Sequence, residues 1–596
     1  MAAKKTKTEE QVDLNVKQRL IKLIVKNFRC IGPKPVEIDL NDIVVLVGEN
    51  NVGKSSILKA YELVMSDGSK LSELKIDDFP NSEIDKGNLP QIELHIIVND
   101  VRVGDKWLSK ISDTDWMVKE RWTWEDIGKP KRQGWNVELN DWDPSSYPFG
   151  PANIANLRRP EPHKVGAFDK PEDQAEEIKK LLIGTIHERV KHLQNEDQEG
   201  EPNDYYQLVE KVKVLQKKIV EETQEQIDAV NAELSGLIEQ VFPNYTIDFD
   251  ARPEEDIQKS INLFKAGSEL LMGPQDGYKS SIEKQGSGAR RTLLWTALKF
   301  IAENNRKLKD DGSTLRPHLL LLDEPEICLH PSAIREACNV LYSLPGSGNW
   351  QVMVTTHSPI FIDFSRDNTT IVRVERDNSG HIQGTTVFRP DKAQLSNDDK
   401  VNLKFLNLCD PYVSEFLFGG RVIIVEGDTE FTAFNYIKSK KIEHYKNVHI
   451  IRARGKATIV SLIKILNHFG SDYSVLHDSD RPLLKTKTGK TRKNSAWGNN
   501  PNILQAVTTR PSGTSCRLLA SLPNFEEAYF GEEAEGDKPY NALQTIMNDP
   551  KKFDTIECLL NALIDHKAAL PDNCIEWSSI EALEAKVDEI LSKAKG

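Results

Sequence analysis

The sequence predicts an α/β protein with two α/β regions and a helical segment inserted into the first. Three observations predict this class. The buried strand "DIVVLVG" runs into a glycine-rich turn and a helix, an order typical of parallel α/β sheets. Apolar residues recur three and four positions apart between 208 and 241, as on one face of a helix. Strands and helices alternate again from about residue 414, where acidic residues follow two of the strands.

Length and composition narrow the class of protein further. A chain of 596 residues is too long for one hydrophobic core, so several domains are expected. No apolar run approaches the roughly 18 residues of a membrane-spanning helix, and the polar N-terminus lacks a signal-peptide pattern. We therefore expect a cytoplasmic protein without membrane contact. The seven cysteines form no C-x-x-C pair, which supports neither a zinc site nor a disulfide framework.

The charge balance argues against a surface that is coated for DNA binding. The chain has 78 basic and 91 acidic residues, a net charge of −13. A local basic patch, rather than the sum, decides whether a protein binds nucleic acid. DNA binding is therefore left open.

The first region reads as strands, a loop and a helix. "LIKLIVKNFRCIG", "KPVEIDL" and "QIELHIIV" read as strands, and "SSILKAYELVM" reads as a helix. Residues from about 100 to 170 are rich in Trp and Pro and are expected to be irregular. Residues from about 172 to 242 are predicted to be helical.

An apolar stripe marks the second part of that helical segment. It allows two interpretations, a packed helical arm or an arm that dimerises the protein. Its members are Leu208, Val212, Leu215, Ile219, Thr223, Ile227, Val230, Leu234, Leu237 and Val241, and all but Thr223 are apolar.

A phosphate-binding loop follows the buried strand. "GENNVGKSS" fits the pattern G-x-x-x-x-G-K-[ST] in the required strand–loop–helix context. Backbone N–H groups of such a loop surround phosphates, the lysine reaches the β- and γ-phosphates, and the first serine binds Mg²⁺. We predict ATP contacts from Gly48, Asn50, Asn51, Gly53, Lys54, Ser55 and Ser56.

Two further strand ends carry residues suited to ATP hydrolysis. In "HLLLLDEPE" a buried strand ends at Asp323 and Glu324. Asp323 is predicted to lie beside Mg²⁺, and Glu324 to polarise the attacking water. The strand "QVMVTTHSP" ends at His357, which is predicted to bind the γ-phosphate.

A glycine turn just before the acidic strand adds a second anion site. "GSGARR" opens a long helix, and helix N-termini bind anions. The loop, turn and acidic strand together resemble the ABC-type ATPase heads of the SMC/RecF group. The resemblance implies that Ser287 and Gly288 complete the nucleotide site of a second head. The motif departs from the family's usual Ser-Gly-Gly-Gln, and no Q-loop glutamine can be placed.

A second acidic cluster is predicted in the last third of the chain. Glu426 ends the strand "RVIIVE", and Asp478 and Asp480 end the strand "YSVLHDSD". Ligands bind at the carboxyl ends of strands in parallel sheets, so these acids should converge and repel one another. Magnesium or manganese, which prefer oxygen ligands, would relieve the repulsion. His477 is expected to pack or to support the site rather than bind metal.

This constellation resembles the Toprim domain of topoisomerases, primases and OLD-family nucleases. The resemblance implies that Glu430 is a further acid of the metal site. A later acid is expected in "LPNFEEAYF", with Glu526 as the candidate and Glu527 as the alternate. It also implies a lysine that assists phosphate chemistry, for which Lys538 is the candidate. Two metal ions would then serve phosphodiester hydrolysis.

A basic loop follows the acids. It reads either as a solvated loop or as a clamp on DNA phosphates. Its basic residues are Arg481, Lys485, Lys487, Lys490, Arg492 and Lys493.

Together the two regions resemble the OLD (overcoming lysogenization defect) family of ATP-dependent nucleases. On this basis 1–160 and 246–400 form the two lobes of the ATPase head. Residues 161–245 form a dimerisation insertion, and 401–596 form the Toprim nuclease domain with C-terminal helices. The resemblance implies metal-dependent DNA cleavage, a homodimer or higher oligomer, and frequently antiphage defence. Some relatives work with a partner, such as a retron reverse transcriptase with its DNA–RNA hybrid.

Three other functions compete with this interpretation. A RecF-like repair ATPase would bind DNA without cutting it, and the acids at 426, 478 and 480 speak against it. A topoisomerase-like strand passer would need a nucleophilic tyrosine and would religate its product. A nucleotide-switched scaffold would show no metal-dependent turnover.

Overall fold

The computed structural model separates the chain into two compact units, which are described one at a time. The first comprises residues 1–46, 52–356 and 376–384, and the second comprises 47–51, 357–375 and 385–596. The described residues are 19–98, 103–112, 115–166, 169–194, 227–239, 242, 244–250, 269–309, 317–347, 350–376, 380, 382, 386–389, 393, 395–485, 491–531 and 536–593. Among the helices in these ranges, none has the length and apolar character needed to cross a bilayer.

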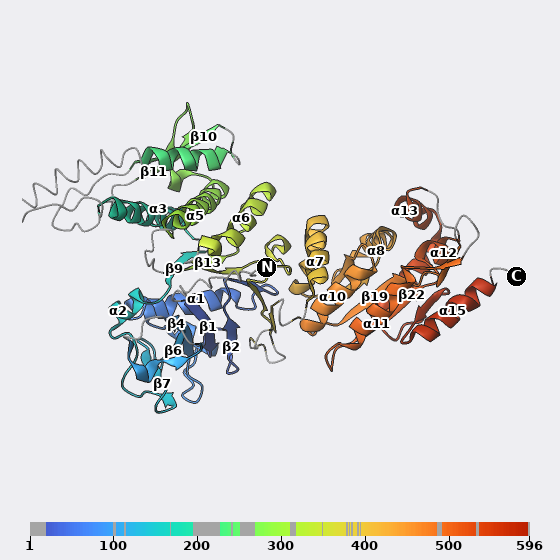
Figure 1. Cartoon of the computed structure of the whole chain (residues 1–596), viewed down its shortest axis with the longest axis horizontal. Helices are drawn as coiled ribbons and strands as arrows, with labels where there is room; N and C mark the ends of the chain where they lie inside the picture. The colour runs from blue at the N-terminus through green and yellow to red at the C-terminus, as the bar shows by residue number, and fades with distance from the viewer. Residues whose placement is uncertain are drawn as a thin grey trace, which may run out of the picture. The chain divides into compact units, whose positions relative to one another are not determined.

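The first unit contains an antiparallel sheet, a parallel sheet and a small three-stranded sheet (Figure 1). Its strands are β1 (Arg19–Lys26), β2 (Val36–Asp39), β3 (Ile43–Val47), β4 (Gln91–Val98), β5 (Ser109–Lys110), β6 (Trp116–Thr123), β7 (Lys131–Asn136), β8 (Asp141–Trp142), β9 (Glu161–Val165), β10 (Tyr245–Asp250), β11 (Glu269–Pro274), β12 (Ser280–Ser281), β13 (His318–Asp323) and β14 (Trp350–Thr355). Its helices are α1 (Lys54–Met65), α2 (Ala152–Leu157), α3 (Pro171–Gln194), α5 (Ser287–Lys309) and α6 (Pro331–Ser343).

The strands predicted from "LIKLIVKNFRCIG", "KPVEIDL" and "QIELHIIV" are confirmed as β1, β2 and β4, and they belong to the antiparallel sheet. Its order is β2-β1-β4-β6-β7-β8, with β5 paired to β6. The strand β4 buries every second residue, as its alternating sequence indicates. The side chain of Gln351 on β14 joins this sheet to the parallel one, because its amide accepts the N–H of Leu20 at 2.9 Å and donates to its carbonyl at 2.8 Å.

The expectation that residues from about 100 to 170 are irregular was wrong. Strands β6 and β7 lie in this segment and pair antiparallel. The buried face of β6 consists of Val118, Glu120 and Trp122, each with no exposed surface. A glutamate at a core position interrupts the apolar alternation by which a strand is recognised in sequence. The pattern is therefore regular in burial but not in hydrophobicity.

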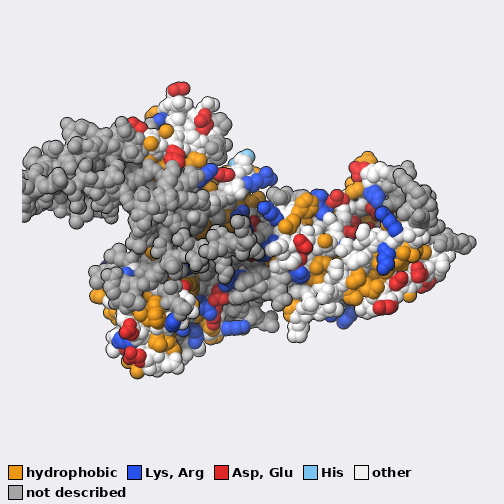
Figure 2. Space-filling model, in the orientation of Figure 1, with side chains coloured by type: hydrophobic (Ala, Val, Ile, Leu, Met, Phe, Trp, Pro, Cys, Tyr) orange, Lys and Arg blue, Asp and Glu red, His pale blue; other side chains and the backbone are white. Residues whose placement is uncertain are grey.

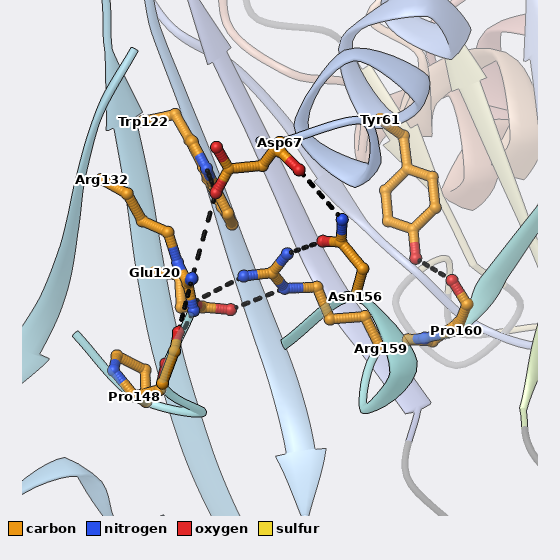
Figure 3. A network of polar contacts seen from close by, with 10 residues as sticks. Tyr61, Asp67, Glu120, Trp122, Arg132, Pro148, Asn156, Arg159 and Pro160 are labelled. Carbon is orange, nitrogen blue, oxygen red and sulfur yellow. Dashed lines mark hydrogen bonds and ion pairs between the residues drawn. The ribbon is translucent and has the colours of Figure 1, made fainter. Parts of the chain in front are cut away.

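Two buried arginines compensate the charge of Glu120 (Figure 3). Arg132 on β7 donates from Nε to Glu120 Oε1 at 2.8 Å, and Arg159 donates from Nε to Oε2 at the same distance. Arg159 also donates to Asn156, which in turn donates to the carbonyl of Asp67 after α1. The network therefore ties β6, β7, the segment after α2 and the end of α1 to one another.

Replacing Glu120 with glutamine is expected to lower the free energy of unfolding of this unit by about 3 kcal/mol. The change removes the carboxylate that both buried guanidinium groups share, and Arg132 then keeps only Asp67, at 3.9 Å. Removing one partner of a buried ion pair is strongly destabilising, because the other charge stays buried. Chemical denaturation measures the effect, with Glu125→Gln at an exposed position just after β6 as control. Equal stability of the two variants would show that the network contributes little.

The parallel sheet positions the predicted nucleotide residues. Strands β3, β14, β13 and β9 pair in that order, and each pair is parallel. β3 and β14 bury all of their residues, as expected for strands that are covered on both faces. Helix α1 lies on one side of this sheet, while α3, α5 and α6 lie on the other (Figure 1).

The predicted helical segment is described in two pieces. Helix α3 occupies 171–194, and residues 227–239 are also helical. Of the stripe residues in the second piece, Ile227, Val230 and Leu234 are buried and Leu237 is half-buried, so the stripe's C-terminal part faces the protein. The rest of the stripe, from Leu208 to Thr223 and at Val241, lies outside the described residues.

The second unit has a five-stranded sheet covered by helices. The strands of the whole unit are β15 (Thr369–Arg373), β16 (Thr386–Phe388), β17 (Arg421–Val425), β18 (Val448–Arg452), β19 (Tyr473–Asp478), β20 (Leu483–Lys485), β21 (Thr491–Lys493), β22 (Cys516–Ser521) and β23 (Cys574–Glu576). Of these, β17, β18, β19, β22 and β23 form the five-stranded sheet. Its helices are α7 (Asn397–Cys409), α8 (Asp428–Lys440), α9 (Ile442–Tyr445), α10 (Lys456–His468), α11 (Asn500–Thr508), α12 (Phe525–Phe530), α13 (Lys538–Asn548), α14 (Pro550–Ile564) and α15 (Ile580–Lys593).

The strand order of this sheet contains a topological switch point. The order is β18-β17-β19-β22-β23, and only the β22–β23 pair is antiparallel. From β17 the chain moves to β18 on one side and then returns to β19 on the other. Crevices form at the carboxyl ends of strands where the order reverses in this way. The sheet therefore offers a ligand site between the ends of β17 and β19.

An apolar cluster between the sheet and its helices holds these strands in place. Val425, Leu476 and Leu519 from three neighbouring strands pack with Phe434 of α8 and Leu560 of α14. On the face drawn in Figure 2, basic, acidic and apolar side chains are intermixed over the described surface. The net charge of −13 therefore does not produce a uniformly acidic face.

Candidate nucleotide and metal sites

The phosphate loop has the backbone that its glycines allow. Asn51 and Gly53 take left-handed conformations with φ of 60° and 87°, and α1 begins at Lys54. A Cβ atom on Gly53 would lie 2.5 Å from Cys30 Sγ, so no larger residue fits there. Gly53 also offers no side chain to cap the helix. The first N–H groups of α1 are therefore available for an anion.

Residues far apart in sequence meet beside this loop. Ser55 Oγ donates to Asp323 Oδ1 at 2.8 Å, and Thr355 Oγ1 donates to the same oxygen at 2.6 Å. Glu324 has a left-handed backbone with φ of 47°, and its N–H donates to the carbonyl of Thr355 at 3.1 Å. The ends of β13 and β14 thus hold Asp323 and Glu324 in a fixed arrangement against the helix start.

Lys54 brings a buried positive charge to the same place. Burial lowers the pKa of Lys54, and the nearby carboxylates of Glu324, Asp323 and Glu326 oppose that shift. The site therefore combines a cation for phosphate oxygens with a hydroxyl and a carboxylate for a magnesium ion. These donors are of the types that ATP with Mg²⁺ requires.

The remaining predicted nucleotide residues follow the carboxyl ends of the neighbouring strands β3 and β14. Gly48, Asn50 and Asn51 belong to the phosphate loop after β3, and His357 follows β14, with its ring 5.7 Å from that of Phe418.

Ser56 and the two signature residues lie in the first unit. Ser56 is buried within the first turn of α1. Ser287 is exposed as the first residue of α5, and a Cβ on Gly288 would lie 2.7 Å from the carbonyl oxygen of Cys328. The nucleotide contacts predicted for all of these residues stay predictions.

The acids of the second unit converge at the switch point of its sheet. Glu426 follows β17 directly, and Asp478 ends the neighbouring β19. The N–H of Asp478 donates to Glu426 Oε2 at 3.1 Å. Asp478 Oδ1 accepts the N–H of Phe525, at the start of α12, at 2.8 Å. Three elements are therefore tied together through two carboxylates.

Two helices contribute further carboxylates to the same place. Glu430 lies in the first turn of α8, and a Cβ on Gly427 would lie 2.9 Å from its Oε2. Glu526 lies in the first turn of α12 and accepts the hydroxyl of Thr429 at 2.8 Å. Both glutamates are buried, with 4% and 7% of their surface exposed. Their neighbour Glu527 is turned away and accepts a bond from Arg481 at 2.6 Å.

The pKa values of three of these acids are raised, because the carboxylates are buried close to one another. Burial raises the pKa of Glu430 to about 8, and the charges of Glu426 and Glu526 add to the shift. Asp478 has a pKa well above its usual range, because it is desolvated beside Glu430, Glu426 and Glu526. Burial also raises the pKa of Glu426, although Lys456 opposes this. Carboxylates gathered in this way form a donor set suited to a divalent cation.

Two lysines accompany the acids. Lys456, the first residue of α10, is buried and forms an ion pair with Asp480. Lys538 Nζ lies 3.8 Å from Glu526 Oε2, so the predicted lysine is near the cluster. Lys456 was not among the site residues predicted from the sequence. Its position after a glycine turn at the end of β18, next to β17, was the available signal.

His477 packs beneath the acids and is unsuited to bind metal. It has no exposed surface, its Nδ1 donates to the carbonyl of Asp478 at 2.7 Å, and its Nε2 accepts the indole N–H of Trp577 at 3.1 Å. Burial lowers the pKa of His477 to about 3, which keeps the imidazole neutral. Both ring nitrogens are therefore occupied by the fold.

The predicted basic loop is only partly described. Strands β20 and β21 pair as a hairpin, on which Arg492 and Lys493 are exposed. Lys485 ends β20, whereas Lys487 and Lys490 lie outside the described residues. Arg481 precedes the hairpin and pairs with Glu527. Of the basic residues predicted to contact DNA, three thus have described side chains.

We expect Glu430→Gln to stabilise the metal-free second unit above pH 8. The folded protein holds a proton on Glu430 up to a pKa of about 8, against an ordinary value of 4.5 for a solvated glutamate. The resulting stability is full below the unfolded pKa and is lost as the pH rises through the folded pKa. At pH 8.5 in EDTA the free energy of unfolding of the variant should exceed that of the wild type by on the order of 2 kcal/mol, as measured by chemical denaturation.

Added Mg²⁺ should narrow this difference, because an ion stabilises the charged wild-type cluster. Glu443→Gln, a change at an exposed position of the same unit, serves as control. A glutamine variant that is less stable than the wild type in EDTA would contradict the proposed crowding.

Comparison with known proteins finds a matching family for each of the two functional regions. Residues 19–116 and 167–362 match the family described as AAA ATPase domain. Residues 417–480 match the family described as Overcoming lysogenization defect protein-like, TOPRIM domain. The chain belongs to the OLD family. The first match includes Gly53, Lys54 and Asp323 of the nucleotide site, and the second includes Glu426, Glu430, Asp478 and Asp480 of the acidic cluster. The predicted fold class, a P-loop ATPase head followed by a Toprim domain, is thereby confirmed.

Three curated nucleases are similar to this chain in sequence, each over a different part of its length. The Old nuclease of Escherichia phage P2 is 25% identical over 482 residues, which span 78% of this chain and 77% of the relative. The OLD nuclease of Thermus scotoductus is 24% identical and covers 88% and 94% of the two chains. Endonuclease GajA of Bacillus cereus is 23% identical and covers 42% and 40%. Among solved structures, an Smc head bound to the C-terminal winged-helix domain of ScpA has a TM-score of 0.38 at 17% identity, covering 63% of this chain and 99% of its own.

Proposed function

We propose that this OLD-family member is a metal-dependent DNA endonuclease whose activity is linked to ATP binding and hydrolysis in its head. The observation that carries the proposal is the cluster of Glu426, Glu430, Asp478, Asp480 and Glu526 at the switch point of the Toprim sheet. Mere binding of DNA phosphates would be opposed by so many carboxylates, whereas metal ions convert them into ligands. The matches to nucleases named Old and OLD support the same class of activity.

The donor set specifies which residues would hold magnesium or manganese. Carboxylate oxygens come from β17, α8, β19 and α12, and no described histidine or cysteine competes with them, since His477 is occupied by Trp577. Such ions activate water and stabilise the leaving oxygen in phosphodiester hydrolysis. Lys456 holds Asp480 by an ion pair, and Lys538 lies close enough to Glu526 to neutralise developing charge on a phosphate.

The head is proposed to bind ATP with Mg²⁺ through the residues around α1. Lys54 serves the phosphates, Ser55 and Asp323 serve the ion, and Glu324 polarises water. Because Ser287 and Gly288 open α5 at an exposed N-terminus, they are proposed to contact the nucleotide of a second head in a homodimer or higher oligomer. His357 is proposed to contact the γ-phosphate.

DNA is proposed to contact the basic hairpin that follows Asp480. Arg492 and Lys493 are exposed there, and the metal ligands precede them in sequence by about a dozen residues. Lysines and arginines that contact phosphates give affinity without sequence preference and with a strong salt dependence. Charge reversal of Arg492 and Lys493 should therefore weaken binding to all DNA sequences alike.

A nuclease assay on the purified full-length protein tests the proposal. Supercoiled, linear and single-stranded DNA are incubated with Mg²⁺, Mn²⁺ or EDTA, each with ATP, ADP or no nucleotide. We expect nicked product only with a divalent ion, and a rate that depends on the nucleotide. Binding without cleavage under every condition would favour a RecF-like clamp. A religated product would favour a topoisomerase-like activity.

A role in antiphage defence is proposed on the family resemblance. Phage should form fewer plaques on cells that express the wild-type protein than on cells that express the Lys54→Ala or Asp480→Ala variant. Equal plaque numbers with all three would argue against this role. Whether a reverse transcriptase with its DNA–RNA hybrid takes part stays a prediction, which co-expression in the same plaque assay tests.

A further inference from the structure

Two histidines and a glutamate gather in the ATPase head, on the edge of the parallel sheet opposite to the nucleotide residues. They are Glu161 and His163 on β9 and His318 on β13, and one ligand atom from each lies within 4.8 Å of the others. His318 begins β13, whereas Asp323 of the nucleotide site ends it. The cluster therefore lies at the amino ends of these strands and takes no part in the proposed ATP chemistry.

Strand register explains why the three side chains share one face. Glu161 and His163 are two residues apart on β9, so they point to the same side of the sheet. His318 pairs with Glu161 across the parallel ladder and also pairs with Trp350 on β14. Paired residues of neighbouring strands project to the same face. All of these side chains therefore emerge toward α3, the helix that packs on β9, and Glu177 and Lys180 of α3 contact His163 and Glu161.

The distances between the ligand atoms fit a shared metal ion. His163 Nε2 lies 3.1 Å from His318 Nδ1, and His318 Nδ1 lies 3.9 Å from Glu161 Oε2. In a tetrahedral zinc site with ligand bonds of about 2.1 Å, neighbouring ligand atoms are roughly 3.4 Å apart. The two imidazole nitrogens already face each other at about this separation.

Glu177 on α3 orients one of the imidazoles. Its Oε1 lies 2.9 Å from His163 Nδ1, so this nitrogen donates to the carboxylate and Nε2 is left with its lone pair. Histidines that bind metal regularly donate their other ring N–H to a carboxylate in this way, which fixes the tautomer and raises the basicity of the ligand. His163 is 4% exposed, so this orientation is held by packing.

A buried donor beside the cluster has no acceptor among the described protein atoms. The Trp350 indole stacks on the His318 ring with centroids 4.7 Å apart, and it lies 5.2 Å from the His163 ring. Its Nε1–H is buried without a hydrogen-bond partner. Leaving such a group unsatisfied costs about 1–3 kcal/mol. Water carried by a metal ion is an acceptor of the kind that this donor lacks.

We propose that Glu161, His163 and His318 bind a zinc ion in the ATPase head. The mixed nitrogen and oxygen donors favour zinc over magnesium, which prefers oxygen ligands alone. Three protein ligands leave one position for water. The absence of cysteine pairs, which spoke against zinc in the sequence, is not relevant to a His₂Glu site.

The ion would fasten the root of the helical insertion to the head. β9 and β13 are joined by the ligands themselves, and α3 is joined through Glu177, which positions His163. Lys180, one turn further along α3, has its Nζ 3.9 Å from Glu161 Oε1 and would move aside when this carboxylate turns to the ion. Its side chain is 54% exposed, so it can reach solvent without strain.

Zinc binding by the full-length protein tests the proposal. The protein is stripped with EDTA, dialysed with excess Mg²⁺ to saturate the carboxylate cluster of the second unit, and titrated with zinc. We expect one zinc ion per chain, and cobalt in its place should give the visible absorption of a nitrogen-bearing, low-coordinate site. His318→Ala should weaken zinc binding at least about 100-fold, and Glu177→Gln about 10-fold.

Variants with different structural demands keep the test decisive. Glu161→Gln removes a partly exposed ligand and preserves side-chain shape, so it serves if His318→Ala fails to fold. His444→Ala, an exposed histidine of the second unit, is the matched control and should bind zinc like the wild type. The proposal is overturned if the wild type binds no zinc in excess Mg²⁺. It is equally overturned if folded Glu161→Gln and His318→Ala bind zinc as tightly as the wild type, which would leave a hydrogen-bonded histidine pair.

Discussion

Replacing Asp478 with asparagine is expected to reduce metal-dependent plasmid nicking at least about 100-fold. Partners that only support metal ligands already cost 10–100-fold when they are removed, so the loss of a ligand carboxylate at the centre of the cluster should cost more. Asparagine retains the oxygen that accepts the N–H of Phe525 at 2.8 Å, and the backbone bond from residue 478 to Glu426 is unchanged. The start of α12 should therefore stay in place, and the effect should be on cleavage.

Glu527→Gln is the matched control for this variant. Glu527 lies beside Glu526 on α12, but its carboxylate is turned to Arg481 and away from the cluster. We expect it to keep at least about half of the wild-type nicking rate, as surface changes usually have small effects. Nicking is followed on supercoiled plasmid with Mn²⁺, and circular dichroism checks the fold. Full nicking by folded Asp478→Asn would refute the assignment of the nuclease to this cluster.

The position of this cluster was predictable because parallel sheets bring the residues at their strand ends together at one edge. Glu426 and Asp478 each come at the end of a buried apolar run, and β17 and β19 are neighbours in the sheet. The choice between Glu526 and Glu527 was harder. Both lie in the first turn of one helix, and they differ in their partners: Glu526 contacts Thr429, whereas Glu527 contacts Arg481. Such a contact depends on how α8 and α12 pack, which no local pattern records.

Residues that act through distant partners escaped prediction for the same reason. Lys456 matters because of Asp480, which lies two strands away in the sheet order. The Glu161, His163 and His318 cluster depends on a pairing between β9 and β13, whose sequences are separated by more than 150 residues. Strand β6 was not recognised from the sequence, because Glu120 occupies a core position and its counter-charges, Arg132 and Arg159, come from other segments. Local patterns identify strand ends, whereas pairs across strands require the topology.

Replacing Lys54 with alanine is expected to lower ATP hydrolysis at least about 100-fold and to weaken ATP binding. The ammonium group is buried at the start of α1 beside three carboxylates, and ATP would bring further negative charge to the same place. Preorganised cations in phosphoryl transfer supply much of the stabilisation of the transition state. Without Lys54, Asp323 and Glu324 would repel the phosphates. Phosphate release and binding of a fluorescent ATP analogue measure the two effects.

Two further variants serve as comparisons. One tests for general damage to the helix, and the other separates nucleotide binding from hydrolysis. Lys59→Ala removes a lysine from the same helix that pairs with Glu62 at 3.1 Å, and it should hydrolyse ATP like the wild type. Glu324→Gln should bind ATP normally yet hydrolyse it slowly, because only the water-polarising charge is lost. In the nicking assay, Lys54→Ala should retain metal-dependent cleavage without nucleotide but lose any response to ATP. If Lys54→Ala instead kept the wild-type response to ATP, the head described around α1 would not be the nucleotide site that controls the nuclease.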